Sequence, residues 1–471
     1  MMPVSINDLF TIMPALVLAL FGCSLFLMRL DSPRVYPAFL VVGEILAAIS
    51  LWRQNGFTSL TGFQGSVVID SFGIYMNAIC LVGTVLAAIG ASRYLEAREE
   101  DHPEFYGLMM LAQSGMYLMN AGTELVTVFI GLEITAVSFY ILTGFLRREP
   151  RSNEAALKYL LLGAFSSGLL LYGFSVLYGL TGSTRYLTMT AQLGTRLPTD
   201  PLILLAVIPI VLGLLFKVAA APMHMWAPDA YDGAPTPVTA FLATASKVAS
   251  FGLLLRLLLG PLHPFRPSWE GVILFAALAS LTIGNLAAIT QSSAKRLLAY
   301  SSIGHAGYLL LGLVAGNQTG IEGMLLYLLV YTLMTTGAFL VLAAMEREGV
   351  EDFRGLLYSH PAIAMLMVIL LLSLAGLPPT AGFFAKYMIF LSLVQTRQYA
   401  VAIVAALYVA VSLYYYFRIV REMTQKPREQ VGPTIAISLG WRAAVGVAAI
   451  LSLGLGLNPE PALSWAREAL R

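Results

Sequence analysis

The sequence predicts an all-α membrane protein that crosses the bilayer about fourteen times, and three observations support this fold class. Of the 471 residues, 58% are hydrophobic and only 11% are charged, whereas soluble domains carry about 25% charged residues. The mean hydropathy is +0.78. Apolar runs follow one another along the chain, and many reach the roughly 20 residues that a helix needs to cross a hydrocarbon core.

The apolar runs define the expected helices. Charged or Gly- and Pro-containing breaks separate them, and the longest connection has about twenty residues, so we expect one integral membrane domain over residues 1–471 and no soluble domain. The expected spans lie near residues 8–28, 35–52, 68–91, 105–121, 124–146, 155–179, 202–221, 238–259, 270–290, 297–315, 321–345, 361–394 in two halves, 399–418 and 435–456.

Composition and motifs exclude several functions for this chain. Cys23 and Cys80 both lie in apolar runs, which argues against a disulfide framework, a multi-cysteine zinc site and an iron–sulfur cluster. The five histidines are too scattered for a metal site, and a net charge of +2 gives no reason to expect a nucleic-acid partner. Neither G-x-G-x-x-G nor a Walker A sequence occurs, so we expect any energy input to come from partners or an ion gradient.

The distribution of basic residues predicts the topology. No Lys or Arg precedes the first apolar run, and Arg29 and Arg34 follow it, the reverse of the order in a cleaved signal peptide. One set of alternating loops holds roughly twice as many Lys and Arg residues as the opposite set. Because the richer side is expected to be cytoplasmic, both termini should lie outside.

Ionisable residues inside the apolar spans are the main candidates for function. Glu133, Lys217, Lys247 and Lys386 lie within such spans. A charge at mid-bilayer costs at least about 2.5 to 3.5 kcal/mol, so these side chains should face protein or water. A Glu/Lys pair whose spacing or hydration changes can hold and release a proton. The alternative is a static buried ion pair that only fixes helix packing.

Four further ionisable residues are less specific. Lys158 lies about one turn inside its span, from where its side chain could extend to the interface. Glu44, at the centre of the second span, has no evident partner. His224 follows Lys217 by seven residues, about two turns, a spacing that would place both side chains on one face despite the break. His305, in SSIGHAGYLLLG, could relay a proton near neutral pH. A structural role remains open for either histidine.

Two spans are expected to be broken, because each combines prolines or glycines with a buried lysine. Residues 217–238 contain Pro222, Pro228, Pro235 and Pro237, and residues 372–387 contain Gly376, Pro378, Pro379 and Gly382. Proline cannot continue a regular helix, and irregular backbone at membrane depth is tolerated only against protein or a wet cavity. Broken segments in corresponding positions of two halves indicate an inverted-repeat transporter.

Four segments carry a specific family resemblance. FIGLEITAVSFYILTGF, LLFKVAAAPMHMWAPDAYDGAPTPVTAFLATASKV, SAKRLLAYSSIGHAGYLL and LLLSLAGLPPTAGFFAKY resemble the antiporter-like subunits of respiratory complex I, the proton-pumping NADH:quinone oxidoreductase. The resemblance extends from about residue 70 onward. The short length, and Lys386 where the subunit M branch carries a glutamate, favour the subunit N branch. Sodium/proton antiporter subunits share the same core motifs and are the alternative.

The resemblance implies a definite architecture and site. Two inverted five-helix repeats would occupy residues 105–260 and 268–420, with helices 7 and 12 discontinuous and helices 1–3 and 14 flanking. Glu133 would pair with Lys217, Lys247 would be the central relay, and Lys386 would lead to the outside. Lys158, His224 and His305 match residues of the same proton relay.

The same resemblance implies a function in a larger assembly. The chain would couple electron transfer from NADH to quinone with proton translocation, without redox chemistry or a cofactor of its own. NADH, FMN, iron–sulfur clusters and quinone would bind other subunits. The expected partners are the lipid bilayer and the neighbouring subunits M and K, in a bacterial inner membrane. Two alternatives are a sodium/proton antiporter subunit and a purely structural membrane-arm subunit.

Overall fold

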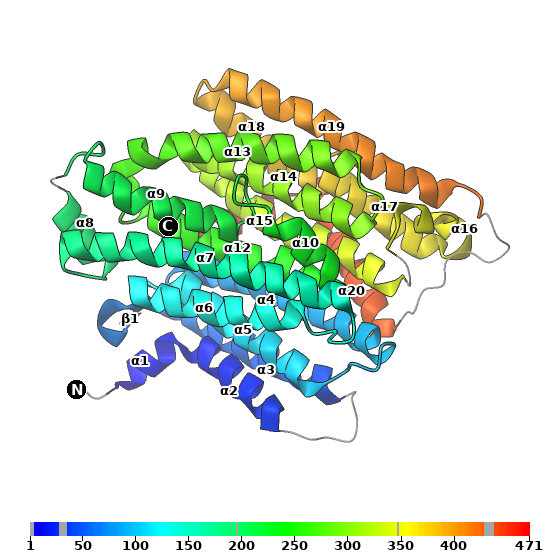
Figure 1. Cartoon of the computed structure of the whole chain (residues 1–471), viewed down its shortest axis with the longest axis horizontal. Coiled ribbons are helices and arrows are strands. Elements are labelled where there is room, and N and C mark those ends of the chain that lie inside the picture. The colour runs from blue at the N-terminus through cyan, green and yellow to red at the C-terminus, as the bar shows by residue number, and fades with distance from the viewer. Residues whose placement is uncertain (1–3, 28–34, 195, 346–347, 428–437) are drawn as a thin grey trace.

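Apolar helices lying roughly along one common direction form the architecture of the protein, seen here in a computed structural model (Figure 1). The structure describes residues 4–27, 35–194, 196–345, 348–427 and 438–471. Among these residues, ten helices are long and apolar enough to cross a membrane, and four shorter apolar helices accompany them. The predicted all-α polytopic membrane fold is confirmed.

The helices follow the predicted spans closely. The first half contains α1 (Ile6–Thr11), α2 (Met13–Leu27), α3 (Val35–Gln54), α4 (Ser71–Glu96), α5 (Pro103–Ala121), α6 (Leu125–Thr143), α7 (Pro150–Thr181), α8 (Tyr186–Leu193), α9 (Pro201–Lys217), α10 (Trp226–Gly233), α11 (Thr236–Ala243) and α12 (Ala245–Leu259). The second half contains α13 (Arg266–Ile289), α14 (Ala294–Ala315), α15 (Gln318–Ala344), α16 (Leu356–Ser359), α17 (Pro361–Ala375), α18 (Ala381–Gln395), α19 (Tyr399–Thr424), α20 (Leu439–Leu457) and α21 (Glu460–Glu468).

Short elements fill the connections. They are the 3-10 helices η1 (Asn55–Phe57), η2 (Phe63–Gly65), η3 (His263–Phe265) and η4 (Val350–Phe353), and the strands β1 (Thr61–Gly62) and β2 (Val67–Val68). The two strands pair antiparallel, with Thr61 opposite Val68. In Figure 1, α1, β1 and α8 lie toward one end of the bundle, and α16 lies at the other.

Both predicted breaks are present, although their prolines behave differently from the expectation. The first break separates α9 from α10, and the second separates α17 from α18. Pro228 and Pro237 do not interrupt helices, because they stand in the first turns of α10 and α11, where the missing N–H has no intrahelical partner to lose. A further interruption, at Thr244 between α11 and α12, was not predicted, and the backbone there has φ −115° and ψ −82°.

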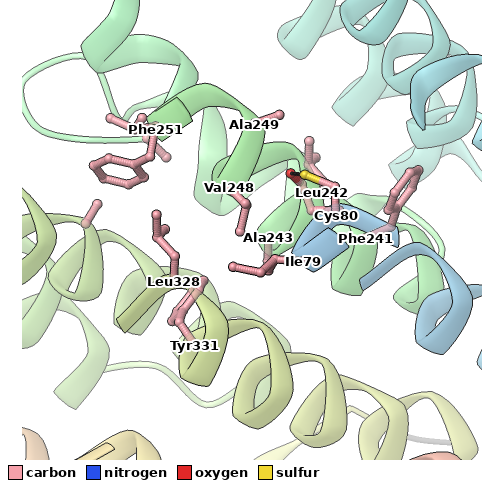
Figure 2. Close-up of a cluster of buried hydrophobic side chains, with 14 of the residues drawn as sticks. Ile79, Cys80, Phe241, Leu242, Ala243, Val248, Ala249, Phe251, Leu328 and Tyr331 are labelled. Atoms are coloured by element: carbon pink, nitrogen blue, oxygen red, sulfur yellow. Dashed lines mark hydrogen bonds between the residues drawn. The ribbon is translucent and has the colours of Figure 1, made fainter. Parts of the chain in front are cut away.

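The centre of the bundle is formed by α11, α12, α14 and α15. The most apolar part of the α11–α12 segment is completely buried, and the most apolar parts of α14 and α15 are 94% buried, against 22% for the peripheral α19. Figure 2 shows how α11 and α12 pack between α4 and α15, with Val248, Ile79 and Leu328 among the contributing side chains. Lys247 on α12 is therefore enclosed by protein.

The basic residues used for the topology prediction are not all in loops. Arg256 lies in the last turn of α12, where its guanidinium donates two hydrogen bonds, of 2.8 and 2.6 Å, to the carboxylate of Asp70. Asp70 also caps the N-terminus of α4. Arg29, Arg34, Arg347 and Arg428 lie outside the described residues.

Candidate functional site: a line of buried ionisable side chains

Glu133 and Lys217 are linked through a hydroxyl group. Lys217 Nζ donates to Ser167 Oγ over 3.3 Å, and Ser167 Oγ donates to Glu133 Oε1 over 2.6 Å. Glu133 lies on α6, Ser167 on α7 and Lys217 at the end of α9. The expected pairing therefore takes the form of a bridge, in which a serine side chain separates the lysine from the acid.

Local backbone geometry places Lys217 at the first break. Lys217 is the last residue of α9, and the chain then turns through the cis peptide bond between Ala221 and Pro222. Side chains satisfy backbone groups around the break: Ser280 Oγ accepts from the Ala221 N–H over 2.7 Å, and Trp226 Nε1 donates to the Phe216 carbonyl over 3.0 Å. The lysine thus sits where irregular backbone is stabilised inside protein.

Lys247 is buried at the centre of the bundle. Its side chain is 1% exposed, and Nζ donates to the carbonyl and the hydroxyl of Ser302, over 2.8 and 2.5 Å. Ser302 Oγ also accepts from the Tyr331 hydroxyl over 3.0 Å, and the lysine ammonium lies 5.5 Å from the centre of the Tyr331 ring. The partners of Lys247 are therefore neutral oxygen atoms and an aromatic face.

Helix α14 carries a polar stripe from Lys247 toward Lys386. Ser302, His305 and Tyr308 follow at intervals of three residues, so they lie along one side of the helix. His305 Nδ1 lies 2.7 Å from the Tyr327 hydroxyl, and Nε2 lies 3.1 Å from the Tyr416 hydroxyl. Lys247 is bonded to Ser302 and Lys386 lies against the Tyr308 ring, so His305 lies on α14 between the residues that the two lysines contact.

Lys386 binds the end of a half-helix. Its Nζ donates to the carbonyls of Leu374 and Ala375, over 3.0 and 2.9 Å, and these are the last two residues of α17. The negative end of the α17 dipole therefore stabilises the ammonium group. Nζ also lies 5.0 Å from the centre of the Tyr308 ring, which completes the connection to α14.

Lys158 lies apart from the buried line. Its side chain is 45% exposed, and Nζ forms ion pairs with Glu154 over 2.8 Å and Asp229 over 3.0 Å. Asp229 is shared with Arg296 of α14 over 2.9 Å. This position agrees with the alternative in which the lysine extends toward the interface, and the ion pairs connect α10 to α7 and α14.

The predicted helical alignment of His224 with Lys217 is wrong. The segment between them is not a helix, because α9 ends at Lys217 and α10 begins only at Trp226. A separation of seven residues therefore does not place the two side chains on one face. His224 is half-buried within the break, and its Nδ1 has no hydrogen-bond partner among the described residues.

The sequence did not identify the hydroxyl groups that connect the site. Ser167, Ser302, Tyr327, Tyr331 and Tyr416 all contact predicted site residues or their partners. Their only local signal is a polar side chain within an apolar span, which is common in membrane helices. Which of them meets a lysine depends on contacts between helices far apart in the sequence.

Comparison with known proteins agrees with this geometry. The model of the NADH:quinone oxidoreductase/Mrp antiporter transmembrane family matches residues 122–412, more than half of the chain. The chain belongs to this family. NADH-quinone oxidoreductase subunit N 2 of Solibacter usitatus is 52% identical, with 98% of both chains aligned. The predicted resemblance to the complex I antiporter-like subunits, and to their subunit N branch, is confirmed.

Solved structures support the same assignment. A chain from respiratory complex I of Thermus thermophilus with bound aureothin is 35% identical, with a TM-score of 0.81 and coverage of 96% of this chain and 98% of that chain. A chain of the Mrp complex from Dietzia sp. DQ12-45-1b has a TM-score of 0.84 at 21% identity, covering 99% of this chain and 97% of that chain. This second likeness concerns the fold alone.

Proposed function

We propose that this antiporter-like membrane-arm subunit of NADH:quinone oxidoreductase translocates protons along the line Glu133, Lys217, Lys247, His305 and Lys386. The observation that carries the proposal is that α14 presents Ser302, His305 and Tyr308 along one side. The amine of Lys247 is bonded to Ser302 at one end of this side, and the amine of Lys386 lies against the Tyr308 ring at the other. Lys247, His305 and Lys386 are buried, and Glu133 and Lys217 are half-buried. Ionisable residues inside a membrane domain are costly and usually mark ion or proton pathways.

The Glu133–Ser167–Lys217 bridge would act as the loading step. Quinone reduction elsewhere in the complex would change the electric field at this subunit and separate Lys217 from Glu133. Without the nearby carboxylate, the protonated lysine is less stable in a low-dielectric surrounding. Its proton would then pass to Lys247. Transfer requires hydrogen-bond reach or one bridging water at each step, so we infer that water carries the proton over this stretch.

The remaining steps would use the α14 stripe. Lys247 would pass the proton by way of Ser302 and His305 to Lys386, which stands beyond the second break. Moving one charge against 100 mV requires about 2.3 kcal/mol. The stability of a buried ammonium group changes by a comparable free energy when it gains or loses a charged partner. Lys158 would lie at the edge of the proton path, where its ion pairs hold α7 against α10. His224 would line the first break.

The two-repeat organisation is part of this proposal. Residues 105–260 would form the first inverted repeat around the break between α9 and α10. Residues 268–420 would form the second, around the break between α17 and α18. Each break has a lysine at the C-terminal end of a helix, which supports this correspondence: Lys217 is the last residue of α9, and Lys386 binds the last carbonyls of α17.

The cellular setting follows from the same family. The chain is a multi-pass membrane protein that assembles with other complex I subunits. We propose that its neighbours are subunits M and K in a bacterial inner membrane, with both termini on the periplasmic side. NADH, FMN, the iron–sulfur clusters and quinone would bind other subunits, and this chain would carry no cofactor.

A pull-down in mild detergent tests the assignment to the assembly. The tagged chain should co-purify with inhibitor-sensitive NADH:quinone reductase activity. A stable complex without this activity would contradict the proposal and favour a sodium/proton antiporter, for which sodium-driven pH changes are the assay.

A lysine variant tests the proton path. Lys217→Met should leave the complex assembled but abolish proton pumping in membrane vesicles, because methionine keeps the length of the side chain without a proton to release. Full pumping by this variant would contradict both proton-translocating functions. It would leave the structural-subunit alternative, in which the buried charges only hold helices together.

A further inference from the structure

The imidazole of His305 is bonded at both nitrogens by phenol groups from two different helices. Nδ1 lies 2.7 Å from the Tyr327 hydroxyl of α15, and Nε2 lies 3.1 Å from the Tyr416 hydroxyl of α19. All three side chains are at most 3% exposed. The two phenols are the hydrogen-bond partners of the ring within the described part of the chain, so they set its orientation.

The Tyr416 hydroxyl is itself held in place from α14. It forms a short hydrogen bond with Oγ of Ser301, a residue that is 2% exposed. Ser301 and His305 are four residues apart on α14, so their side chains are neighbours on the helix surface. One phenol hydroxyl therefore bridges two successive turns of α14, and it cannot leave the imidazole without also straining its bond to Ser301.

Helix α19 was not expected to contribute to the site. It lies along one edge of the bundle (Figure 1) and packs against α13, α14, α17 and α18. Tyr416 also lies beyond residues 122–412, which the family model matches. The contact between α19 and His305 is therefore an observation of this structure, and the family likeness does not supply it.

The residue next to Tyr416 has a different partner. Tyr415 is equally buried, at 2% exposed, but its hydroxyl donates to Asn285 Oδ1 of α13 over 3.0 Å. Adjacent phenols on one helix thus bind the imidazole in one case and a neutral amide of the surrounding scaffold in the other. This pair separates a role at the site from a role in helix packing.

Relay by an imidazole depends on the partners of both nitrogens. In a neutral ring, the hydrogen bond at one nitrogen determines which nitrogen carries the proton. In the protonated ring both nitrogens are donors, and a phenol oxygen can accept from each. A buried nitrogen without a partner would cost about 1 to 3 kcal/mol. Tyr327 and Tyr416 together therefore let His305 gain and lose a proton without an unpaired N–H.

We propose that Tyr416 is a positioning residue for His305: its hydroxyl, fixed by Ser301, holds the imidazole in one orientation with Nδ1 on Tyr327. The inference rests on the proposed proton path. The ring takes up a proton at its free nitrogen lone pair, the imidazolium donates to both phenol oxygens, and one of its two N–H protons then leaves. Only the position of a proton changes, and no other reactant is needed.

Tyr416→Phe tests the positioning in the assembled complex. It keeps the aromatic ring and removes only the hydroxyl. The rate of proton pumping by inside-out vesicles, per amount of assembled complex, should fall about fivefold, the factor that corresponds to one lost hydrogen bond of about 1 kcal/mol.

Tyr415→Phe is the matched control, because it removes a hydroxyl of equal burial from the adjacent residue. It should pump at the wild-type rate. Equal pumping by the Tyr416→Phe and Tyr415→Phe variants would overturn the inference, because a hydroxyl that only supports helix packing would matter equally at both positions.

Ser301→Ala is a second and milder variant, which stays informative if Tyr416→Phe fails to assemble. It leaves Tyr416 in place but removes the hydroxyl that holds it. Pumping should fall by less than in Tyr416→Phe. A Ser301→Ala variant that pumps like the wild type would contradict the bridge between the two turns of α14.

A double variant provides a readout that packing alone would not change. If Tyr416 acts through the imidazole, Tyr416→Phe should cause no further loss of pumping in a His305→Gln background, since the two effects are then not additive. Additive losses would overturn the inference.

Infrared difference spectra during turnover provide a spectroscopic signature. The imidazole bands that His305→Gln removes belong to His305. Tyr416→Phe should shift these bands, and Tyr415→Phe should leave them unchanged. Bands at the wild-type position in Tyr416→Phe would contradict the positioning role.

His305→Gln alone distinguishes failure of this inference from failure of the proposed function. If His305→Gln lowers pumping and Tyr416→Phe does not, only the positioning role of Tyr416 is wrong. If His305→Gln pumps at the wild-type rate, the proposed path through His305 is wrong, and the inference is overturned with it.

Discussion

Lys217 and Lys386 stand at the two broken helices, but different atoms stabilise their ammonium groups. Lys217 reaches a side-chain hydroxyl, Ser167, and through it the acid Glu133. Lys386 donates to two main-chain carbonyls, those of Leu374 and Ala375. The first lysine depends on side chains that can rotate, and the second depends on the fixed end of a helix.

This difference suggests different roles for two similar positions. Side-chain rotamers exchange far faster than helix ends rearrange, so the partners of Lys217 can change during turnover while those of Lys386 persist. The Lys217 site is therefore suited to gain and lose stabilisation for its proton. The Lys386 site is suited to accept protons under constant conditions.

Removal of the acid at the first site should have the largest effect. Glu133→Gln leaves Lys217 without a carboxylate. Loss of one partner of a fully buried charge pair costs about 3 to 5 kcal/mol, which is the upper bound for this half-buried, serine-bridged pair. We expect proton pumping in vesicles to fall at least about tenfold while the complex still assembles.

Glu154→Gln is the control for the acid, because Glu154 also pairs with a lysine, Lys158, but is 66% exposed. It should pump almost normally, since exposed pairs contribute about 1 kcal/mol or less. An equal loss of proton pumping in the two variants would show that the Glu133 site behaves no differently from an exposed ion pair.

The fixed nature of the second site can be tested at Gly376. This residue has φ +82°, and an added Cβ would stand 2.7 Å from Cδ of Lys386. Gly376→Ala should destabilise the protein by about 1 to 3 kcal/mol through backbone strain and should displace the lysine from its carbonyl partners. The measurements are the thermal stability of the purified complex and its pumping.

Gly182→Ala isolates the strain from the contact with Lys386. Gly182 also has a positive φ, of 64°, but nothing lies within 4 Å of an added Cβ. It should lose stability and keep pumping. If Gly376→Ala loses stability but pumps as well as Gly182→Ala, the position of Lys386 does not matter.

The bridging hydroxyl should have an intermediate effect. Ser167→Ala removes one hydrogen bond between Lys217 and Glu133, worth about 1 kcal/mol, so pumping should fall but not disappear, and Ser167→Thr should retain it. Ser166→Ala is the matched control, because the adjacent Ser166 is buried and donates to the Gly213 carbonyl outside the site. Similar pumping by the two alanine variants would contradict the bridge.

A carboxyl group outside the membrane should have the smallest effect and provides a baseline for pH experiments. Burial raises the pKa of Asp101, in the α4–α5 connection, from 3.8 to about 6. The native state therefore binds more protons than the unfolded chain, and stability should fall as pH rises through about 4 to 6. Because the side chain is partly exposed, the contribution should be below about 1 kcal/mol.

Asp101→Asn should remove this dependence while keeping an acceptor for the Tyr106 hydroxyl, which donates to Asp101 over 2.8 Å. Unfolding temperatures measured between pH 4 and 7 test this directly. A variant with the same pH profile as the wild type would exclude Asp101 as the titrating group. Proton pumping should not change.

Most of the fold was predictable because apolar length decides where a helix can span a membrane. Boundaries such as Val35 and Pro361 were predicted to the residue, and both breaks were found from Pro and Gly next to lysine. The Thr244 junction was missed because no Pro or Gly marks it. The short helix α8 was missed because its eight residues lie in a connection between spans.

The site was predictable only in part. Lys247 and Lys386 stand out because charge is rare inside apolar spans, and the structure buries both. The exposure of Lys158 and the Ser167 bridge depend on how α7 packs against α6, α9 and α10, which local sequence does not encode. The His224 alignment failed because helical spacing was assumed across a segment that is not helical.

A pair of structures of the assembled complex, one at rest and one trapped during NADH oxidation, would show directly whether the two lysine sites behave differently. We predict that the separation between Lys217 Nζ and the Glu133 carboxylate differs between the two states. In both states Lys386 should keep its hydrogen bonds to Leu374 and Ala375. An unchanged Lys217 site, or a rearrangement confined to Lys386, would contradict the account.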